Sequence, residues 1–422
     1  MLKIALVGVG TVGAAVADIL RQNRSVISAR AGKEIRVVKG IVKNTERKRA
    51  NVDFPISADY REATDDPQID AVVELMGGVE YAYEIVKAAL KNKKAVVTAN
   101  KALLAYRRYE LEELAGGIPF AYEASVAGGI PIIRALRDGL SANHIESIRG
   151  VINGTCNYML TRMFEKRVGF ARALKEAQEL GYAEADPTFD VGGFDAAHKL
   201  LIMASLAYGI DAKPEDMLIE GIGHLTDEDI TFAEEFGYTI KSLAIAKKQG
   251  DKVSLRVHPA FISRKDMIAK VDGVMNGVSL IGDMSGETFY YGAGAGGKAT
   301  ASSVVADLIA LARGETSPML GFRRPNERKL SVARKDEIES KYYIRVLVED
   351  VAGVLAQTAA ILASRDISIE TVLQRKKRVK KEWANLLLST HKAREIDLIE
   401  ALKEIGALSF VKSPPVMLRI ES

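Results

Sequence analysis

Apolar positions near the start of the chain fall into two kinds of segment that alternate. Short apolar runs of strand length occupy residues 3–8, 35–42, 71–75, 95–98 and 120–122, and segments with the apolar spacing of a helix occupy residues 11–21, 83–91 and 109–115. Strands that alternate with helices predict a parallel sheet covered on both faces, which is the doubly wound plan. We therefore expect an α/β chain whose first domain, residues 1–128, is Rossmann-like.

Beyond residue 128 the predicted elements become longer and their order less regular. Helical spacing occurs over residues 130–139, 157–164, 172–180 and 194–208, and strand-like runs occur over residues 144–152, 253–259, 273–281 and 287–291. This mixture predicts an α+β domain over residues 129–313. Its last helix, residues 299–313, follows a glycine-rich turn, and we expect this helix to pack back on the first domain and complete it.

The last part of the chain has a pattern of its own. Residues 314–340 contain two prolines, many charges and weak periodicity, which is typical of a linker. Strand-like runs then occur at 342–348, 367–374, 383–390 and 416–420, and helical segments occur at 353–363 and 396–405. This βαββαβ order predicts a separate ferredoxin-like unit over residues 341–422. Within it, six of the seven residues 375–381 are basic; we interpret them as a solvated hairpin tip, with nucleic-acid contact as the alternative.

Composition and charge narrow the class of protein. With 422 residues, 48% hydrophobic and 27% charged, the chain has the length for two or three domains and the make-up of an ordinary globular protein. The net charge of +4 is too small to indicate nucleic acid as the main partner. No uncharged run reaches the ~20 residues that a membrane-spanning helix needs. A single cysteine, Cys156, excludes an internal disulfide and a cysteine-rich zinc site, and fits the reducing cytoplasm.

A glycine motif lies between the first predicted strand and the first predicted helix. It consists of Gly8, Val9, Gly10, Thr11, Val12 and Gly13, in the pattern GxGxxG. Such glycines permit a tight turn and a close approach of the backbone to a pyrophosphate, whose charge the helix N-terminus attracts. We therefore predict a dinucleotide site here; the alternative is a glycine-rich turn without a ligand.

The residues after the second predicted strand bear on the choice of cofactor. A site specific for NAD has an acidic residue there, which binds the ribose 2′-hydroxyl. This chain has Lys43 and Asn44 instead, followed by Arg47, Lys48 and Arg49. Cations suit a 2′-phosphate, so the sequence favours NADP, with NAD as the second possibility. A basic solvated loop is the alternative interpretation.

Four carboxylates and a lysine gather around one predicted helix start. The acidic residues are Glu184, Asp186, Asp190 and Asp195. Asp195 and Lys199 are one helical turn apart, so their side chains lie on one face of the helix, where a surface salt bridge is one interpretation. Because residues 200–206 are almost entirely apolar, we instead expect the helix to be buried. A buried lysine can be tuned to exchange protons near neutral pH.

Four further residues draw separate interpretations. Lys101 follows the fourth predicted strand, at the carboxyl edge where doubly wound folds bind ligands, so it either reaches a substrate or is an exposed lysine at a helix start. Thr155 belongs to the segment GVINGTCNY, which offers a hydroxyl and backbone donors after a strand. Cys156 has no evident histidine partner and is interpreted as a packing residue. We interpret His198 as structural.

Six motifs, in order along the chain, carry a resemblance to a known family. They are GVGTVG from Gly8, ELMGG from Glu74, TANKALLA from Thr98, YEASVAGGIPII from Tyr122, GVINGTCNYML from Gly150 and GYAEADPTFDVGGFDAAHK from Gly181. Over residues 1–320 the chain closely resembles homoserine dehydrogenases. Residues 350–355, DVAGVL, resemble the first strand-to-helix turn of an ACT domain, so the C-terminal unit looks like that regulatory module.

The resemblance implies an activity and roles for individual residues. The activity is the reversible NAD(P)-dependent conversion of L-aspartate 4-semialdehyde to L-homoserine, on the route to threonine, isoleucine and methionine. By this resemblance Lys199 is the proton donor, Asp195 supports it, and Lys101 contacts substrate and cofactor. The residues that hold or surround the substrate are Glu184, Asp190, Thr155 and Tyr182. A homodimer or higher homo-oligomer is expected, with dimerisation assigned to residues 129–313.

The resemblance also implies how cofactor and cation are bound. Besides the glycine motif, the expected cofactor contacts are Lys43, Gly77, Thr98, Lys101, Gly181 and Gly297. A sodium ion or similar monovalent cation is expected at Glu123 and the backbone of Val126, Gly128 and Ile130, ligands that suit a hard cation. Many family members have Arg-Asp where this chain has Lys43 and Asn44. Without the acid NAD binding should suffer, although lysine is less suited than arginine to bidentate phosphate contact.

Two other functions compete with this interpretation. A reductase that forms or consumes an acyl phosphate needs a cysteine nucleophile with a histidine base, and Cys156 lacks such a partner. A catalytically silent NADP-binding amino-acid sensor would need no proton donor, so the presence of Glu184, Asp195, Lys199 and Lys101 together argues against it. The ACT-like unit implies an amino-acid effector, for which threonine is the hypothesis.

Overall fold

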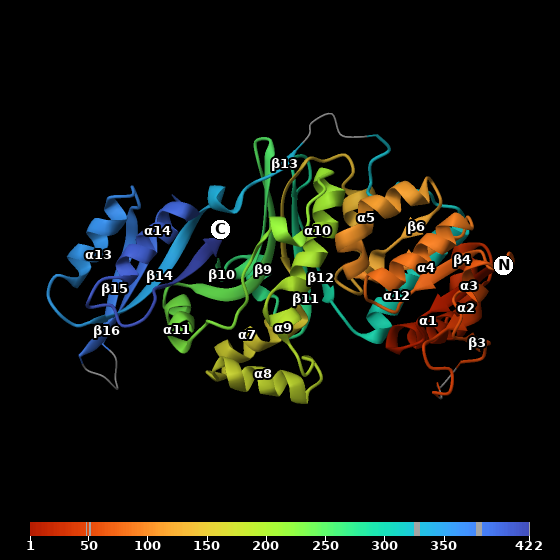
Figure 1. Cartoon of the computed structure of the whole chain (residues 1–422), viewed down its shortest axis with the longest axis horizontal. Coiled ribbons are helices and arrows are strands. Elements are labelled where there is room, and N and C mark those ends of the chain that lie inside the picture. Colours follow the sequence, from red (N-terminus) through yellow and green to blue (C-terminus); the bar gives the residue numbers. More distant parts are fainter. Residues whose placement is uncertain (48, 50–51, 325–329, 377–381, 422) are drawn as a thin grey trace.

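The chain folds into an elongated body with three regions along its long axis (Figure 1). The computed structural model describes residues 1–47, 49, 52–324, 330–376 and 382–421. The N-terminal region lies at one end, the C-terminal region at the other, and a mixed sheet with its helices lies between them. In the described part of the chain no helix is both long enough and apolar enough to cross a membrane.

The N-terminal region is built on a parallel sheet of six strands. The strands are β1 Leu2–Val7, β2 Ile35–Ile41, β3 Ile56–Ser57, β4 Ala71–Glu74, β5 Ala95–Thr98 and β6 Phe120–Ala121, and the helices are α1 Thr11–Gln22, α2 Arg24–Ala31, α3 Arg61–Thr64, α4 Glu80–Lys91 and α5 Lys101–Ala115. The strand order is β3-β2-β1-β4-β5-β6. From β1 the chain first adds strands on one side and then, from β4 on, on the other side, and such sheets bind ligands at this switch point. The predicted doubly wound plan is confirmed.

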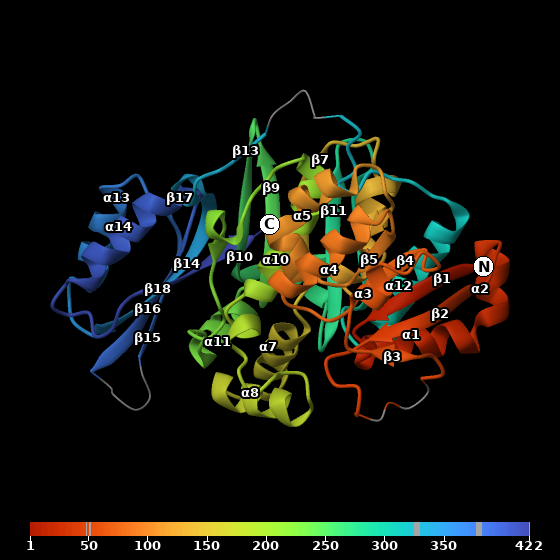
Figure 2. The same cartoon turned by 45° about the vertical axis from the view of Figure 1, so that its right-hand side comes forward.

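Helices cover both faces of this sheet. Leu20 of α1 packs in the core on one face, together with Leu308 of α12 (Gly297–Arg313), and Ile85 of α4 and Leu104 of α5 pack in the core on the other. The prediction that the helix near residues 299–313 returns to the first domain is therefore confirmed. Figure 2 shows α12 beside the N-terminal strands.

One helix of this region is much longer than predicted. We expected it at residues 109–115, whereas α5 begins at Lys101 because the side chain of Asn100 accepts a hydrogen bond from the Leu103 amide and caps it. Arg108 hides the pattern, since this charged residue is only 2% exposed and donates to the Ala212 carbonyl.

The middle region combines a mainly antiparallel sheet with helices on its faces. Its strands are β7 Ile145–Val151, β8 Leu218–Ile219, β9 Tyr238–Gln249, β10 Lys252–Ser263, β11 Met275–Gly282 and β12 Gly286–Ala293. Its helices are α6 Ile132–Arg134, α7 Gly154–Lys166, α8 Phe170–Glu179, α9 Thr188–Val191, α10 Phe194–Tyr208 and α11 Asp227–Glu235, with short turns η1 Glu123–Ser125, η2 Ala135–Gly139, η3 Pro214–Asp216 and η4 Met267–Lys270. The α+β prediction is confirmed.

One helix of this region was predicted wrongly, and α9, α11, β8 and β9 were not predicted. The single helix expected over residues 130–139 is instead the short α6 followed by η2, a π-helical turn. Strand β9 was missed altogether. Its third and fourth residues, Ile240 and Lys241, are both buried, and Lys241 can be so because its ammonium group donates to Asp272 and the Val271 carbonyl.

The C-terminal region has the predicted βαββαβ order. Its elements are β14 Glu339–Glu349, α13 Val354–Ala363, β15 Ile369–Lys376, β16 Trp383–Thr390, β17 Ala393–Arg394, α14 Glu395–Gly406 and β18 Val416–Glu421. The strands lie in the order β18-β14-β16-β15, and both helices pack on one face, where Leu362 and Leu398 join the core. Residues 377–381 of the basic stretch and Lys48 lie outside the described residues.

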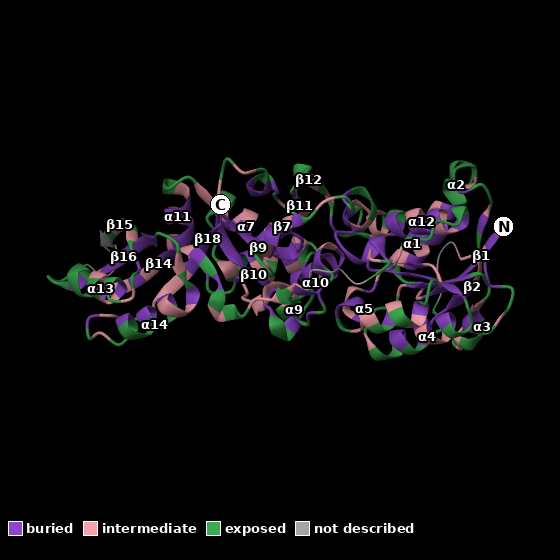
Figure 3. Ribbon diagram, turned by 90° about the horizontal axis from the view of Figure 1, so that it is seen from above, coloured by how far each residue is buried: buried purple, intermediate pink, exposed green. Residues whose placement is uncertain are grey.

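The expected separation of this unit is contradicted. β18 pairs in parallel with β10, which joins both sheets into one path from β12 to β15. Part of the expected linker is also structured: β13 (Ser331–Val332) pairs with β10, η5 (Lys335–Glu337) follows, and β14 begins at Glu339. Residues 325–329 of that linker lie outside the described part. Figure 3 shows buried residues around β18, β10 and β9, where the two parts of the sheet meet.

Candidate active site

A cavity of about 490 Å³ lies where the N-terminal region meets the middle region. Its wall includes the carboxyl edge of the parallel sheet, the start of α7, the α9–α10 segment and residues 293–296. Eight of the residues singled out in the sequence line it, namely Lys101, Gly128, Thr155, Gly181, Tyr182, Asp190, Asp195 and Lys199. A cavity of this size suits a small ligand.

Asp195 lies at the centre of the charged groups in this cavity. Its Oδ1 is 3.0 Å from the Lys101 ammonium and its Oδ2 is 2.8 Å from the Lys199 ammonium. Burial alone would raise the pKa of Asp195, but the two cations hold it well below its ordinary value. The carboxylate therefore remains ionised and holds two lysines, one from each side of the cavity.

Lys199 is held in a buried position on α10. Only 11% of its side chain is exposed, and its ammonium also donates to the Ile152 carbonyl at 2.7 Å. The helix that carries it is buried on nearly every side, as the apolar run 200–206 predicted. The pair with Asp195 is thus not a surface salt bridge.

Lys101 reaches the same carboxylate from the N-terminal end of α5. Burial alone would lower its pKa, but Asp195, with smaller contributions from Asp190 and Glu184, raises it above the ordinary value. With 36% of the side chain exposed, this ammonium is the more open of the two. Lys101 is therefore a cation available to a ligand in the cavity.

Asn153 is a site residue that the sequence analysis missed. Its Nδ2 donates to Asp190 at 2.8 Å and to Asp195 at 2.9 Å, while its Oδ1 accepts from the Cys156 amide and caps α7. Burial raises the pKa of Asp190, against the effect of the Asn153 hydrogen bond. The one available hint was an asparagine just before a helix, but that helix was predicted to begin only at residue 157.

Asn276 on β11 was also missed. Its side chain is 1% exposed and lines the cavity, and its Nδ2 donates to the Ile152 carbonyl, the same acceptor that Lys199 uses. Its Oδ1 has no hydrogen-bond partner, which leaves an acceptor for a ligand. Nothing in the local sequence distinguishes this asparagine from an ordinary strand residue.

The remaining predicted substrate residues differ in their placement. The Thr155 hydroxyl donates to the Tyr182 carbonyl at 2.5 Å, so these two residues form one wall. Glu184 is exposed and lies outside the cavity lining, although its charge is felt by Lys101. Cys156 is buried, and burial raises the pKa of its thiol well above the ordinary value, as expected of a packing residue. His198 packs edge-on against the rings of Tyr106 and Phe189.

The glycine motif has the geometry that a dinucleotide requires. Gly8 has φ +100°, and a Cβ there would lie 2.8 Å from the Leu75 carbonyl group, so only glycine allows this contact. A Cβ on Gly13 would collide with the carbonyl oxygen of Gly8. In contrast, no atom lies within 4 Å of a Cβ position on Gly10, which caps α1 without any side-chain partner. Open space and free amides at one helix N-terminus fit a pyrophosphate.

Other predicted cofactor residues border the same sheet edge. Glu74 accepts from the Gly77 amide and the Thr98 hydroxyl, which fixes the loops after β4 and β5. A Cβ on Gly297 would lie 2.9 Å from Thr11, so α12 starts directly against the glycine motif. Lys43 is exposed after β2.

The basic residues after β2 are not all free for a phosphate. Arg49 donates to the Val9, Arg47 and Asn44 carbonyls, so its guanidinium fastens the loop to the glycine motif. Lys43 has no acidic partner within the described residues. Arg47 is exposed as well, and Lys43 is the described cation nearest the end of β2, so it stays the candidate for the ribose end of a cofactor.

Two buried carboxylates meet where a cation is expected, Glu123 of that segment and Asp307 of α12. Glu123 accepts from the Ile133 and Arg134 amides, and its own amide donates to Asp307. Burial and the Asp307 charge raise the pKa of Glu123 to about 7, and burial raises that of Asp307 to about 6. Among the described residues, Arg134 forms an ion pair with each of the two carboxylates, at 3.7 and 3.2 Å. When both carboxyl groups are ionised, their charge exceeds that of Arg134, which fits a cation.

Two of the backbone carbonyls expected to bind that cation each accept one hydrogen bond from the protein. The Gly128 carbonyl accepts from the Ser303 hydroxyl at 2.7 Å, and the Ile130 carbonyl accepts from the Ile132 amide at 2.8 Å. A carbonyl oxygen has two lone pairs, so each retains one for a cation. Val126 is fully buried beside them.

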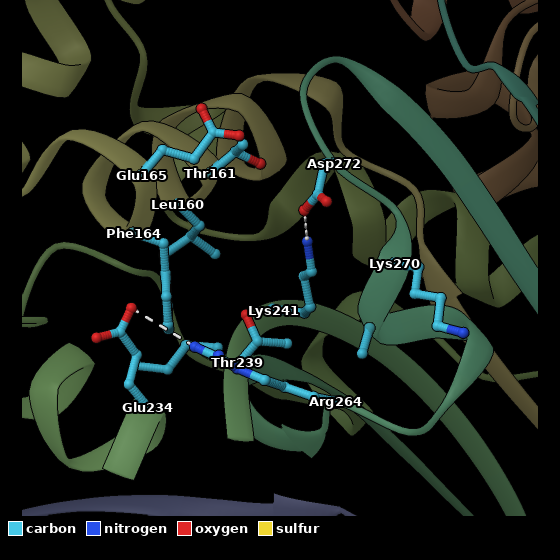
Figure 4. A pocket seen from close by; sticks show the side chains of 12 residues that line it. Leu160, Thr161, Phe164, Glu165, Glu234, Thr239, Lys241, Arg264, Lys270 and Asp272 are labelled. Carbon is cyan, nitrogen blue, oxygen red and sulfur yellow. Dashed lines mark hydrogen bonds and ion pairs between the residues drawn. The ribbon is translucent and has the colours of Figure 1, made fainter. Parts of the chain in front are cut away.

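A second hollow, of about 380 Å³, lies between α7, β9 and η4 (Figure 4). No residue that the sequence singled out lines it. Its charges are largely paired with one another: Lys241 with Asp272 at 2.7 Å and Arg264 with Glu234 at 3.5 Å. None of the residues expected to bind substrate or cofactor lines this hollow.

Models of three protein families match the chain. A model described as homoserine dehydrogenase matches residues 131–309, one described as homoserine dehydrogenase, NAD binding domain, matches residues 8–117, and one described as ACT domain matches residues 342–410. The matches follow the three regions of the fold in order.

Individual relatives cover nearly the whole chain. A homoserine dehydrogenase of Helicobacter pylori is 54% identical over 421 residues, covering 100% of this chain and 99% of that protein. One of Pseudomonas aeruginosa is 44% identical, covering 99% and 98%. The crystal structure of a homoserine dehydrogenase from Thiobacillus denitrificans superposes with a TM-score of 0.93 at 43% identity, covering 100% and 98%. These similarities and the geometry of the site together establish that the chain belongs to the homoserine dehydrogenase family of NAD(P)-dependent oxidoreductases.

Proposed function

We propose that the chain catalyses the reversible NAD(P)-dependent interconversion of L-homoserine and L-aspartate 4-semialdehyde in the 490 Å³ cavity. The observation that carries this proposal is the position of Asp195 between Lys101 and Lys199 beside the dinucleotide sheet. The nicotinamide cofactor, when bound, supplies or accepts the hydride. The residues of the chain bind and orient the substrate and handle the proton.

Lys199 is proposed as the proton donor to the carbonyl oxygen. An ammonium group has three N–H donors, and two are used by the Ile152 carbonyl and Asp195. The third is free to donate to a substrate oxygen. As negative charge develops on that oxygen, a fixed ammonium stabilises it and transfers the proton.

Asp195 and Lys101 are proposed to prepare the site for this step. Asp195 keeps Lys199 in place and balances its charge, and Lys101 offers a second cation to substrate or cofactor. Asp190 and Glu184 are proposed to bind the substrate's ammonium and hydroxyl groups, with Thr155 and Tyr182 as the wall. Gly181 is proposed to contact the cofactor from the same loop.

For the cofactor we propose NADP in preference to NAD. The support is the exposed Lys43 after β2 and the absence of an acidic residue among Lys43, Asn44 and Thr45. A hyperthermophilic archaeal homoserine dehydrogenase in complex with NADPH is 26% identical, with a TM-score of 0.63, and covers 77% of this chain. We further propose a sodium or similar monovalent ion at Glu123, supported by the surplus charge of the two buried carboxylates.

We also propose a pathway, an effector and an assembly. The product homoserine leads to threonine, isoleucine and methionine, and the ACT domain is proposed to sense threonine. Homodimerisation is proposed through residues 129–313. A threonine titration of activity and sedimentation of the purified protein test these two proposals; unchanged activity at saturating threonine, or a monomer, contradicts them.

The activity itself is tested by the absorbance of the reduced nicotinamide. Purified protein is mixed with L-homoserine and either NADP or NAD, and cofactor binding is followed separately by fluorescence. We expect homoserine-dependent reduction that is faster with NADP. Cofactor binding without any homoserine-dependent reduction would contradict the proposal and favour a silent amino-acid sensor.

A further inference from the structure

Two short strands lie end to end along one edge of β10. β8 pairs with Arg256 and Val257, and β18 pairs with residues 260–262 further along. β8 belongs to the middle region, whereas β18 is the last strand of the ACT domain. The residue after β8, Glu220, therefore comes close to the ACT domain, and its amide donates to the Val257 carbonyl.

The segment that follows β8 presses on the turn between Asp190 and Asp195. The Ile222 amide donates to the Val191 carbonyl at 3.0 Å. A Cβ on Gly221 would lie 2.5 Å from that same carbonyl oxygen and 3.0 Å from the Cα of Gly192, so the two backbones are in direct contact. This turn connects two carboxylates of the active site, and its position therefore sets theirs.

Residues 219 and 220 contact the end of this turn, at Gly193. Gly193 has φ +89°, and a Cβ there would lie 3.3 Å from Ile219 and 3.4 Å from the Glu220 carbonyl oxygen. Gly193 is the residue that starts α10, which carries Asp195 and Lys199. A shift of residues 219–222 would be transmitted to the start of this helix by direct contact.

The ACT domain binds residues 219–222 through Arg419 of β18, which donates hydrogen bonds to Glu220. Its two terminal nitrogens donate to the two oxygens of Glu220, at 2.7 and 2.9 Å, while its Nε donates to Glu395 of the ACT domain at 2.9 Å. Arg419 is 0% exposed and Glu395 is 2% exposed. A second pair, Arg345 with Asp229 at 2.8 Å, holds the start of α11.

We propose that Arg419 and Glu220 are positioning residues of the active site, through which the ACT domain holds the Asp190–Asp195 turn in its catalytic geometry. The inference rests on the proposed function for the identity of the substrate. In this view the domain supports catalysis even when no effector is bound. A bidentate pair with a buried guanidinium suits this role because it fixes direction as well as distance.

The test compares Glu220→Gln with a matched control in the full-length protein. The control is Glu337→Gln, which breaks the exposed Lys252–Glu337 pair across the same boundary, 2.8 Å long and away from the turn. We expect Glu220→Gln to lower kcat/KM for homoserine by about tenfold, a loss of ~1.4 kcal/mol. The dissociation constant for NADP and the midpoint of thermal unfolding should stay close to those of the control.

A conservative variant and a measurement without substrate complete the test. Glu220→Asp keeps the carboxylate, so it should recover most of the loss. If Glu220→Gln fails to fold, Arg419→Lys takes its place with the same expected loss, because lysine keeps the charge but not the bidentate contact. Hydrogen exchange should be faster at the Gly192 and Ile222 amides in Glu220→Gln but not in Glu337→Gln. Unchanged kinetics and exchange, or equal losses for homoserine and NADP with lower thermal stability, would overturn the inference. If the unmodified protein fails to oxidise homoserine, the proposed substrate is wrong, and the exchange result still decides the positioning role.

Discussion

The ammonium of Lys101 and the carboxylate of Asp195 lie 3.0 Å apart although they come from different regions of the chain. Lys101 starts α5 on the parallel sheet, and Asp195 lies in the first turn of α10 beside the mixed sheet. Asp195 also holds Lys199 at 2.8 Å. One carboxylate therefore sets the relative position of the cofactor side and the proton-donor side of the cavity.

Replacing Lys199 with alanine should affect the chemical step and not cofactor binding. We expect Lys199→Ala to lower kcat by about 10²- to 10⁴-fold, the usual contribution of a positioned acid or base. The NADP dissociation constant should change little, because the contacts of the ammonium are Asp195 and the Ile152 carbonyl. Lys213→Ala, an exposed lysine beyond the end of α10, serves as the control. A near-normal kcat in Lys199→Ala would remove this residue from the mechanism.

Asn153→Ser should separate capping from substrate binding. A serine hydroxyl can still accept from the Cys156 amide and cap α7, but it cannot donate to Asp190 and Asp195 together. Hydrogen bonds to charged groups contribute about 1.5–3 kcal/mol, so we expect KM for homoserine to rise roughly tenfold or more. The thermal midpoint should fall less than in Asn153→Ala, which loses the cap of α7 as well. Loss of stability with unchanged KM would show that the cap alone matters.

Lys43→Ala should weaken the binding of NADP selectively. The exposed lysine at the end of β2 is expected to meet the 2′-phosphate, which NAD lacks. We expect the dissociation constant of NADP to rise by about five- to tenfold, a charged-contact effect, with that of NAD unchanged. Lys39→Ala removes another lysine of β2, one paired with Glu62, and should leave both values as they are. Equal weakening for NADP and NAD would contradict the phosphate contact.

Glu123 should make stability depend on pH in the mildly acidic range. Its pKa is raised from 4.5 to about 7, so between these values the folded protein binds more protons than the unfolded one. Stability then falls as pH rises through this window, by at most about 1.4 kcal/mol per pH unit for one proton. Glu123→Gln, which never ionises, should flatten the dependence of the thermal midpoint on pH.

The same variant tests the cation. Sodium chloride should raise the thermal midpoint near neutral pH more than the chloride of a bulky organic cation at equal ionic strength, because a bound ion offsets the charges of Glu123 and Asp307. Glu123→Gln should abolish the difference, whereas Glu113→Gln, at an exposed helix position, should keep it. Identical midpoints in both salts for the unmodified protein would count against a cation site.

The sequence predicted those elements whose ends are marked by local chemistry. Helix α10 was predicted at its observed bounds, since Gly193 and Gly209 at its two ends both have the left-handed backbone that glycine favours. The pair of Asp195 and Lys199 was predictable as well, because a spacing of four residues places both side chains on one face of a helix. Strand β9 was hidden because it buries the charged Lys241, whose partners, the Val271 carbonyl and Asp272, lie thirty and thirty-one positions later.

What stayed hidden in the site depends on contacts between distant segments. Asn153 and Asp190 are thirty-seven positions apart, so no local pattern relates them. Arg108 disguised the first half of α5 because its partners, including Ala212, lie on another region. The junction of β10 with β18 is equally non-local, and the charged, weakly periodic residues 314–340 indicated separation where the fold has a continuous sheet.

The continuous sheet also limits how the C-terminal region can move. A break in the chain between residues 314 and 340 would leave the two parts joined by the β10–β18 ladder, the Arg419–Glu220 pair and the stacked rings of Phe261 and Tyr343. The C-terminal region is therefore attached to the middle region by the sheet as well as by the chain. A change of twist at β15, the last strand of this sheet, can be transmitted from strand to strand to β10 in the middle region.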